Sequence, residues 1–353
     1  MYIKSLRASN LRNLDDVAFQ PHQGLNYLYG RNGAGKTSVL ESIIVLSRGR
    51  SFRTSQAMDL VGPKGRTFNV FAEICNRDNI TIRLGLERSG KRWRGRIDGR
   101  DLSQISQLTR RLPAVMMEPD SHQLISGSPE NRRKYLDWGM FHVEHGFLSV
   151  WRNYSKALKQ RNAALRRGNN AVLESINEVL AVHGTQLSEM RETYAGRVSS
   201  RIGAMMSRIS ESAPKVTLEY QPGWSAESYL AALQGSQKRD LERGMTLNGP
   251  HRADLALNCG RQAAKAVLSR GEQKALAAAM HLTQAEILID TGEKPVLLLD
   301  DLVSEFDRWH FKRVLDAATS LNVQTWLTGT EKPGLKLPHK MFHVKQGSVK
   351  ELL

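Results

Sequence analysis

A glycine-rich turn followed by a lysine and a threonine is the stretch whose residue types and spacing point most directly to chemistry. Gly30, Gly35, Lys36 and Thr37 match the pattern G-x-x-x-x-G-K-[ST], and Gly33 adds a further glycine inside the loop. Glycines let the backbone wrap around phosphates, so that successive N–H groups and the N-terminus of the next helix face anionic oxygens. The lysine would reach the β and γ phosphates, and the threonine hydroxyl would bind Mg²⁺.

The elements expected around this loop are those that a phosphate-binding loop requires. Apolar residues at 25–28 predict a buried strand before the loop, and apolar residues at 39–44 recur at helical spacing after it. The sequence therefore predicts a site for a nucleoside triphosphate, with ATP and Mg²⁺ as its ligands. The candidate binding residues in this loop are Gly30, Arg31, Asn32, Gly33, Ala34, Gly35, Lys36 and Thr37.

Two adjacent aspartates predict the second part of the site. They end the segment PVLLLDD (295–301), whose apolar run is typical of a central parallel strand. Ligands of open α/β sheets bind at the carboxyl ends of the strands. We expect Asp300 to hold Mg²⁺ through water and Asp301 to orient or deprotonate the attacking water, with Lys36 as the third catalytic residue. An ordinary buried strand that ends in a capped turn is the alternative.

The charge of the chain predicts a polyanionic partner. Lys and Arg total 51 against 35 acidic residues, giving a net charge of +16. Such an excess indicates nucleic acid or an anionic membrane surface, and a protein that is merely basic is the alternative. The candidate phosphate-contacting clusters are Lys91, Arg92, Arg94, Arg96 and Arg100 with Trp93; Arg132, Arg133 and Lys134; and Lys156, Lys159, Arg161, Arg166 and Arg167.

Cysteine content and hydropathy restrict the location. Cys75 and Cys259 are the two cysteines, and there is no CxxC motif, which argues for a reducing compartment and against a zinc site. No apolar run is long enough to cross a bilayer, and the first residues lack the apolar centre of a signal peptide. We expect a cytoplasmic protein with no membrane partner.

The order of patterns along the chain indicates an α/β core interrupted by a helical lobe. Runs at 68–75 and 80–88, and a third that ends at Asp98-Gly99, predict an antiparallel meander. Apolar residues from 172 to 209 mark one helical face, in which Gly184, Gly196 and Gly203 predict bends or breaks. The expected division is 1–118 as the first part of an ATPase lobe, 119–250 as a helical lobe, and 251–353 as the second part of the ATPase lobe.

A third motif resembles the signature of ABC ATPases. LSRGEQKALAAAMHL (268–282) is similar to the usual LSGGQ form and precedes an Ala/Leu-rich helix. Alone, S-x-G-E before a helix is also an N-cap with an acidic first turn. The resemblance implies that the signature contacts the γ phosphate held by a second subunit, so that ATP binding produces a homodimer. The residues that it assigns are Ser269, Gly271, Glu272 and Gln273.

Several further segments resemble the RecF family, whose members are related to the heads of chromosome-maintenance proteins. They are LRNL (11–14), GRSFRT (49–54), EPDSHQLISGSPENRRKYLD (118–137), LNGPHRAD (247–254) and LLLDDLVSEFD (297–307). The resemblance implies an ABC-type, SMC/Rad50-like P-loop ATPase head with an inserted helical lobe. It implies recombinational repair and replication-fork maintenance, with the SOS response, and RecA loading on DNA with RecO and RecR as partners.

The same resemblance assigns roles to single residues. Gln123 is the candidate Q-loop residue and joins Thr37 and Asp300 as a metal ligand. Asp301 stands where many cassettes carry glutamate, and the shorter side chain implies a slow ATPase in which hydrolysis acts as a release switch. Two roles are compatible with the sequence at Arg12: a contact with bound nucleotide, or a solvated arginine in a loop.

Two other functions are compatible with parts of the sequence. The nucleotide-binding subunit of an ABC transporter predicts a histidine at the switch position, where this chain has Thr328-Gly329-Thr330. The head of an SMC-like complex predicts long coiled-coil heptads, which the segment 172–209 is too short to provide.

Overall fold

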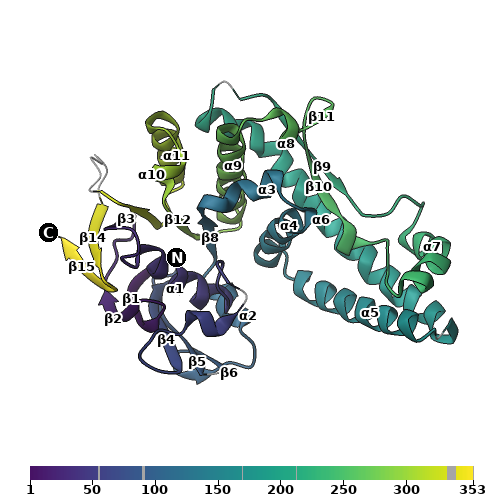
Figure 1. The fold of residues 1–353 in the computed structure, drawn as a ribbon, viewed down its shortest axis with the longest axis horizontal. Coiled ribbons are helices and arrows are strands. Elements are labelled where there is room, and N and C mark those ends of the chain that lie inside the picture. Colours follow the sequence, from purple (N-terminus) through teal and green to yellow (C-terminus); the bar gives the residue numbers. More distant parts are fainter. Residues whose placement is uncertain (55, 90–91, 169, 212, 332–338, 353) are drawn as a thin grey trace. The chain divides into compact units, whose positions relative to one another are not determined.

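The computed structural model describes residues 1–54, 56–89, 92–168, 170–211, 213–331 and 339–352, and the chain forms two compact units (Figure 1). Unit 1 comprises Met1–Ser121, Arg208–Glu211 and Ala278–Leu353. Unit 2 comprises His122–Ser207 and Ser212–Ala277. Lys91 of the predicted basic hairpin lies outside the described residues.

Unit 1 is built on a six-stranded sheet in the order β15-β14-β3-β13-β12-β8. Every neighbouring pair is parallel except β14 with β15. Its central strands are buried along almost their whole length, and β8 and β12 are continuous apolar runs, as is typical of strands covered on both faces. Their bounds are β3 Leu25–Tyr29, β8 Ala114–Met117, β12 Val296–Leu299, β13 Thr325–Gly329, β14 His339–Lys345 and β15 Ser348–Leu352.

The second sheet of unit 1 is antiparallel, with the order β2-β1-β4-β5-β6-β7. The predicted meander is confirmed, and Asp98 and Gly99 turn between its last two strands with φ of 48° and 80°. Positive φ at both residues is the signature of a type I′ hairpin turn. The strands are β1 Tyr2–Leu11, β2 Leu14–Phe19, β4 Thr67–Cys75, β5 Thr81–Ser89, β6 Arg92–Ile97 and β7 Arg100–Asp101.

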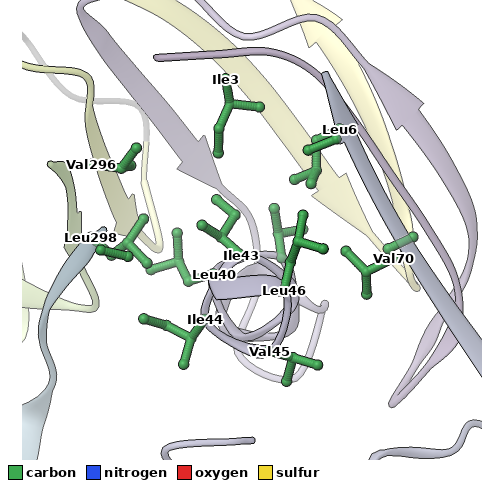
Figure 2. Packing of buried hydrophobic residues seen from close by; sticks show 14 of the residues in the cluster. Ile3, Leu6, Leu40, Ile43, Ile44, Val45, Leu46, Val70, Val296 and Leu298 are labelled. Atoms are coloured by element: carbon green, nitrogen blue, oxygen red, sulfur yellow. The ribbon is translucent and has the colours of Figure 1, made fainter. Parts of the chain in front are cut away.

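Helix α1, Lys36–Arg48, lies at the centre of the hydrophobic core of unit 1. Figure 2 shows Leu40, Ile43 and Ile44 on this helix, with side chains of both sheets around it. Burying one such side chain contributes roughly 1.5–3 kcal/mol to stability, so the core holds the start of α1 firmly in place. The other helices of unit 1 are α2 Ser106–Arg111, α10 Leu302–Glu305, α11 Arg308–Ser320 and the second half of α9 Arg270–Ile289.

Unit 2 is mainly helical and contains one small antiparallel sheet of order β11-β10-β9. Its helices are α3 Gln123–Ser126, α4 Pro129–Val143, α5 Phe147–Arg167, α6 Leu173–Ile209, α7 Tyr229–Arg243 and α8 Ala264–Val267. Its strands are β9 Val216–Gln221, β10 Asp254–Cys259 and β11 Gln262–Ala263. Short 3₁₀ segments at Ala57–Leu60, Pro119–His122, Asn170–Val172 and Pro250–Arg252 complete the fold.

Helix α6 is continuous over 37 residues, so the breaks predicted at its glycines are absent. A glycine costs a helix only about 1 kcal/mol relative to alanine, and the buried apolar face of α6 outweighs that loss. Gly184 has a packing reason, because a Cβ there would lie 2.3 Å from the ring of Tyr229. Around Gly196 and Gly203 no described atom would meet a Cβ within 4 Å.

Candidate functional site

The glycine-rich loop joins β3 to α1 and has a backbone that side chains would disrupt. Gly33 and Gly35 have φ of 77° and 115°, a region that L-residues with side chains rarely adopt. A Cβ on Gly30 would lie 2.2 Å from the carbonyl oxygen of Val344 in β14. The loop is also tied to the C-terminal hairpin, because the Gly347 N–H donates to the Ala34 carbonyl at 2.9 Å.

Asn13, in the turn between β1 and β2, braces the loop from the side of the antiparallel sheet. Its Nδ2 donates to the Gly33 carbonyl at 2.9 Å, and its Oδ1 accepts from the Ser38 hydroxyl at 2.8 Å. One amide thus connects the middle of the loop to the first turn of α1. The segment 11–14 is notable in the sequence only as part of a family resemblance, and nothing in its spacing predicts this contact.

Arg12 is a structural ion-pair partner of α1. Its guanidinium donates Nε to Glu41 Oε2 and Nη2 to Glu41 Oε1, both at 2.9 Å. Because Glu41 is fully buried, this fork-to-fork pair supplies the counter-charge that a buried carboxylate requires. The hydrogen bonds with Glu41 raise the pKa of Arg12. The alternative of a solvated loop arginine is therefore wrong.

Lys36 lies over its own loop. Its ammonium donates to the carbonyls of Gly30 at 2.7 Å and Arg31 at 3.1 Å. Desolvation lowers the pKa of this lysine, and the charges of Asp301 and Asp300 oppose that shift. Two backbone carbonyl oxygens of the loop thus fix the position of the ammonium.

Asp300 and Thr37 meet directly, although 263 residues separate them in the sequence. The Thr37 hydroxyl donates to Asp300 Oδ2 at 2.9 Å, and the Thr328 hydroxyl donates to Asp300 Oδ1 at 2.7 Å. Only 4% of Asp300 is exposed, and burial raises its pKa while the two hydroxyl bonds oppose the rise. A hydroxyl and a carboxylate in contact are the oxygen ligands that Mg²⁺ takes in proteins, so these residues fit that ion.

Asp301 is held in a strained backbone conformation beside Asp300. Its φ is 51°, its N–H donates to the Thr328 hydroxyl at 2.8 Å, and its Oδ2 accepts from the Ser304 hydroxyl at 2.7 Å. Thr328 therefore accepts from one aspartate and donates to the other, so it fixes their relative positions. In the sequence, Thr328 is notable only because it stands where transporters carry a histidine.

Glu118 is a further acidic group at this edge of the sheet. It directly follows β8, and the register pairs Met117 with Leu299, so that Glu118 and Asp300 occupy neighbouring positions on adjacent strands. Burial raises the pKa of Glu118 to about 7, with Asp120 and Asp300 adding to the rise and Arg48 opposing it. The detectable signal in the sequence is an acidic residue placed directly after the apolar run 114–117.

The signature residues lie in unit 2, at the start of α9. The Ser269 N–H donates to Glu272 Oε2 at 2.8 Å and the Glu272 N–H donates to Ser269 Oγ at 3.3 Å, which is a reciprocal capping box. Ser269 and Gly271 are exposed, whereas Gln273 is buried and donates to the Leu268 carbonyl at 2.9 Å. The motif is therefore an N-cap, and its serine and glycine are accessible to a ligand.

Two residues from the segments that carry the family resemblance have defined places. Gln123 begins α3 in unit 2 and is exposed, so it belongs to a different compact unit from Thr37 and Asp300. Asp307, the last residue of the segment LLLDDLVSEFD, caps α11 by accepting from the N–H groups of Trp309 and His310, at 2.8 and 2.9 Å.

Two of the predicted phosphate-contacting arginines are structural. Arg161 is fully buried and donates to Asp240 at 2.6 Å, and Arg132 is 8% exposed and paired with Asp254 at 2.6 Å. Both are therefore unavailable to a polyanion, and their inclusion in the basic surface was wrong. Burial was not readable from the sequence because the acidic partners lie 79 and 122 residues away.

In the described parts of the chain, no cluster of three or more His, Cys, Asp or Glu side chains could hold a metal. None of the helices that could be searched is long and apolar enough to cross a bilayer.

Comparison with known proteins agrees with this geometry. The family model for the RecF/RecN/SMC N-terminal domain matches residues 2–350. The chain is 40% identical over 360 residues to the DNA replication and repair protein RecF of Stenotrophomonas maltophilia (strain R551-3), covering 99% of each chain. It is 37% identical over 358 residues to that of Coxiella burnetii (strain RSA 493 / Nine Mile phase I), again covering 99% of each.

Solved structures give the same result. The recombination mediator protein RecF-ATP of the RecFOR pathway superposes with a TM-score of 0.91 at 27% identity, covering 100% of this chain and 98% of the other. The Smc head domain from Pyrococcus furiosus has a TM-score of 0.60 at 17% identity, covering 99% and 96%, which is a likeness of fold alone.

The fold and the loop–aspartate site define an ABC-type ATPase head of the SMC class, as the sequence predicted. Within that class the chain belongs to the RecF family.

Proposed function

We propose that this chain is an ATP-dependent DNA-binding protein of recombinational repair and replication-fork maintenance. The observation that carries the proposal is the contact of Thr37 with Asp300, because it joins the phosphate-binding loop to the strand-end carboxylate. The proposal is supported by relatives named DNA replication and repair protein RecF and by a similar structure named as RecF-ATP.

Within this proposal the residues of unit 1 hold ATP and Mg²⁺. Thr37 and Asp300 are the metal ligands, and Lys36 with the loop N–H groups binds the phosphates. Bound Mg²⁺ would neutralise phosphate charge during hydrolysis. We assign the third position at the metal to Glu118 in preference to Gln123, because Glu118 shares the strand-end edge with Asp300.

Asp301 orients the attacking water in this proposal, and hydrolysis acts as a slow release switch. Its carboxylate is already bonded to Ser304, at 2.7 Å, so it must be shared between that hydroxyl and water. We expect low turnover for that reason.

The second half of the site comes from a twin molecule. Ser269, Gly271, Glu272 and Gln273 would close on the γ phosphate held by another protomer, making ATP binding equivalent to homodimerisation. The exposed Ser269 and Gly271 at a helix N-terminus support this, since such termini attract anions. The capping box sets a requirement: the Ser269 hydroxyl must accept from Glu272 and donate to phosphate at once.

The functional lobes are proposed at 1–118 with 251–353 for ATP, and 119–250 for the helical insertion. The compact units differ from these lobes, because residues 251–277, which contain the signature, belong to unit 2.

As partners we propose DNA, RecO, RecR and RecA, which would act together at gaps in DNA. We place this function in the cytoplasm and within the SOS response. A transporter subunit or an SMC-like head is less well supported, because the chain covers 99% of a RecF relative.

Two substitutions test the proposal. Lys36→Ala removes the phosphate-binding ammonium, so ATP binding and ATP-dependent retention on DNA should both be lost. Lys64→Ala, which changes an exposed lysine of unit 1, is the matched control and should change neither. Filter binding with labelled ATP and with DNA gives both readouts.

Ser269→Arg separates binding from assembly. ATP binding should persist because the phosphate loop is intact, whereas sedimentation at saturating Mg-ATP should show monomers. Ser200→Arg, an exposed serine on α6, is the control for the added charge. An unsubstituted protein that stays monomeric at saturating Mg-ATP would contradict the two-subunit site.

A further inference from the structure

Helix α5 of unit 2 carries an unusual distribution of charge. Its 21 residues contain six arginines and lysines and no aspartate or glutamate. One of the six, Arg161, is the buried partner of Asp240. The other five are all exposed, and four of them define what we call the α5 stripe: Lys156, Lys159, Arg166 and Arg167.

These four residues lie on one side of the helix. At about 100° per residue, Lys159, Arg166 and Arg167 lie roughly 60°, 80° and 20° around the axis from Lys156, all inside a sector of about 100°. With a rise of 1.5 Å per residue, Lys156 and Arg167 are about 16 Å apart along the axis. The stripe is therefore a straight, rigid row of cations and not a scattered set.

The charges of the stripe are not neutralised by the protein. Among the residues that the structure describes, none of the four forms an ion pair. Arg166 and Arg167 lie in the last turn, where cations favour the helix dipole. That ordinary role does not extend to Lys156 and Lys159, which lie about three and two turns earlier.

The other predicted basic clusters are more nearly neutralised. In the hairpin, Arg94 and Arg96 both pair with Asp101, at 2.9 and 2.8 Å. At the start of α4, Lys134 pairs with Glu130 at 2.6 Å. Arg133 of the same helix donates to a backbone carbonyl at 2.7 Å. Arg92 and Arg100 of the hairpin are also exposed and without an ion pair, but among the described residues the α5 stripe is the larger set of such cations.

We propose that the α5 stripe binds the phosphate backbone of duplex DNA, an inference that rests on the proposed DNA-binding function. Four lysines and arginines in a row contact phosphates without reading bases, which gives sequence-independent affinity. The exposed aromatic residue of α5, Trp151, lies about 140° around the helix axis from Lys156 and so outside the sector of the stripe. Single-stranded binding sites use aromatic platforms for base stacking, so the stripe fits a duplex better than a single strand.

The test measures the salt dependence of DNA binding. A fluorescein-labelled 30-base-pair duplex of mixed sequence is titrated with protein in Mg-ATP between 50 and 200 mM KCl. The variant combines Lys156→Gln, Lys159→Gln, Arg166→Gln and Arg167→Gln. Four lost contacts should reduce the slope of log K against log salt by about 3.6. The unsubstituted protein should thus lose roughly 10²-fold more affinity than the variant across this range.

The matched control removes four exposed cations elsewhere in unit 2: Lys215, Lys238, Arg239 and Arg261, each changed to Gln. It alters net charge equally and should leave the slope within about one unit of the unsubstituted value, as sites off the contact surface do. Unchanged ATP binding and circular dichroism for both variants establish that the fold is intact.

Other outcomes overturn the proposal in distinguishable ways. If the unsubstituted protein binds the duplex and the stripe variant keeps its slope, the surface assignment is wrong while the proposed function stands. If the unsubstituted protein binds no duplex in Mg-ATP, the proposed function fails with it. If the stripe variant loses as much affinity for a single-stranded 30-mer as for the duplex, the duplex preference is refuted. If it loses affinity only for phosphatidylserine vesicles, the stripe binds a membrane surface instead.

Discussion

Removing Arg161 should destabilise unit 2 without acting on any ligand. Its side chain is fully buried and donates Nε to Asn177 at 2.7 Å and Nη1 to Asp240 at 2.6 Å and Thr246 at 2.9 Å. Asp240 is also fully buried. Arg161→Met keeps the packing of the stem but leaves a buried carboxylate without its counter-charge.

The expected cost follows from that uncompensated charge. Breaking a buried pair by removing one partner costs about 3–5 kcal/mol. Arg161→Met combined with Asp240→Asn removes both charges and keeps an acceptor for the Leu247 N–H, which donates to Asp240 at 3.1 Å. The double variant retains the penalty of the unpaired Asn177 and Thr246, about 1–3 kcal/mol, so it should be more stable than the single variant.

Hydrogen exchange of the α5 and α7 amides, read by mass spectrometry, reports this local stability. A loss of 3 kcal/mol in the free energy of local unfolding accelerates the exchange of these amides roughly 150-fold. Lys159→Met, an exposed cation on the same helix, is the control and should change exchange by less than about threefold. Exchange in Arg161→Met that matches this control, or equal exchange in single and double variants, would refute the reasoning.

Two further predictions concern titration and backbone space. Burial lowers the pKa of His251 to about 4, so as pH falls the unfolded state binds a proton before the folded state does. The free energy of unfolding of unit 2 should therefore fall by about 3 kcal/mol from pH 6.5 to 4. Denaturant unfolding of His251→Gln should lack that pH dependence. Gly30→Ala places a Cβ 2.2 Å from the Val344 carbonyl oxygen, so ATP affinity measured by filter binding should drop more than about tenfold. Gly33 has open space around it, so Gly33→Ala meets only backbone strain of roughly 1–2 kcal/mol. The Gly33→Ala variant should therefore bind ATP more tightly than Gly30→Ala.

The parts of the fold that could be predicted are those with local signals. The phosphate loop, the strands at 25–28 and 295–299, and the meander were predicted because glycine spacing and apolar runs are contained within a few residues. The continuity of α6 was not predicted, because its glycines are offset by packing against residues far along the chain, such as Tyr229.

The site was predicted in its main residues but not in its connections. Nothing in the sequence spacing shows that Thr328 bridges the two aspartates or that Asn13 braces the loop, since each contact joins separate segments. Long-range pairing also decided which cations are buried. Arg161 and Lys159 are two positions apart on one helix, and only the positions of distant acids separate their roles.

The pairing of β3 with β14 has a consequence for synthesis on the ribosome. The strand that enters the phosphate loop lies between β13 and β14, so its neighbours are Thr325–Gly329 and His339–Lys345. Translation proceeds from the N-terminus at about 5–20 residues per second. β3 and the loop emerge early, yet the two strands that flank β3 begin 296 and 310 residues after its last residue, Tyr29. A nascent or truncated chain that lacks them cannot complete this sheet, so nucleotide affinity should arise only as the final strands leave the exit tunnel.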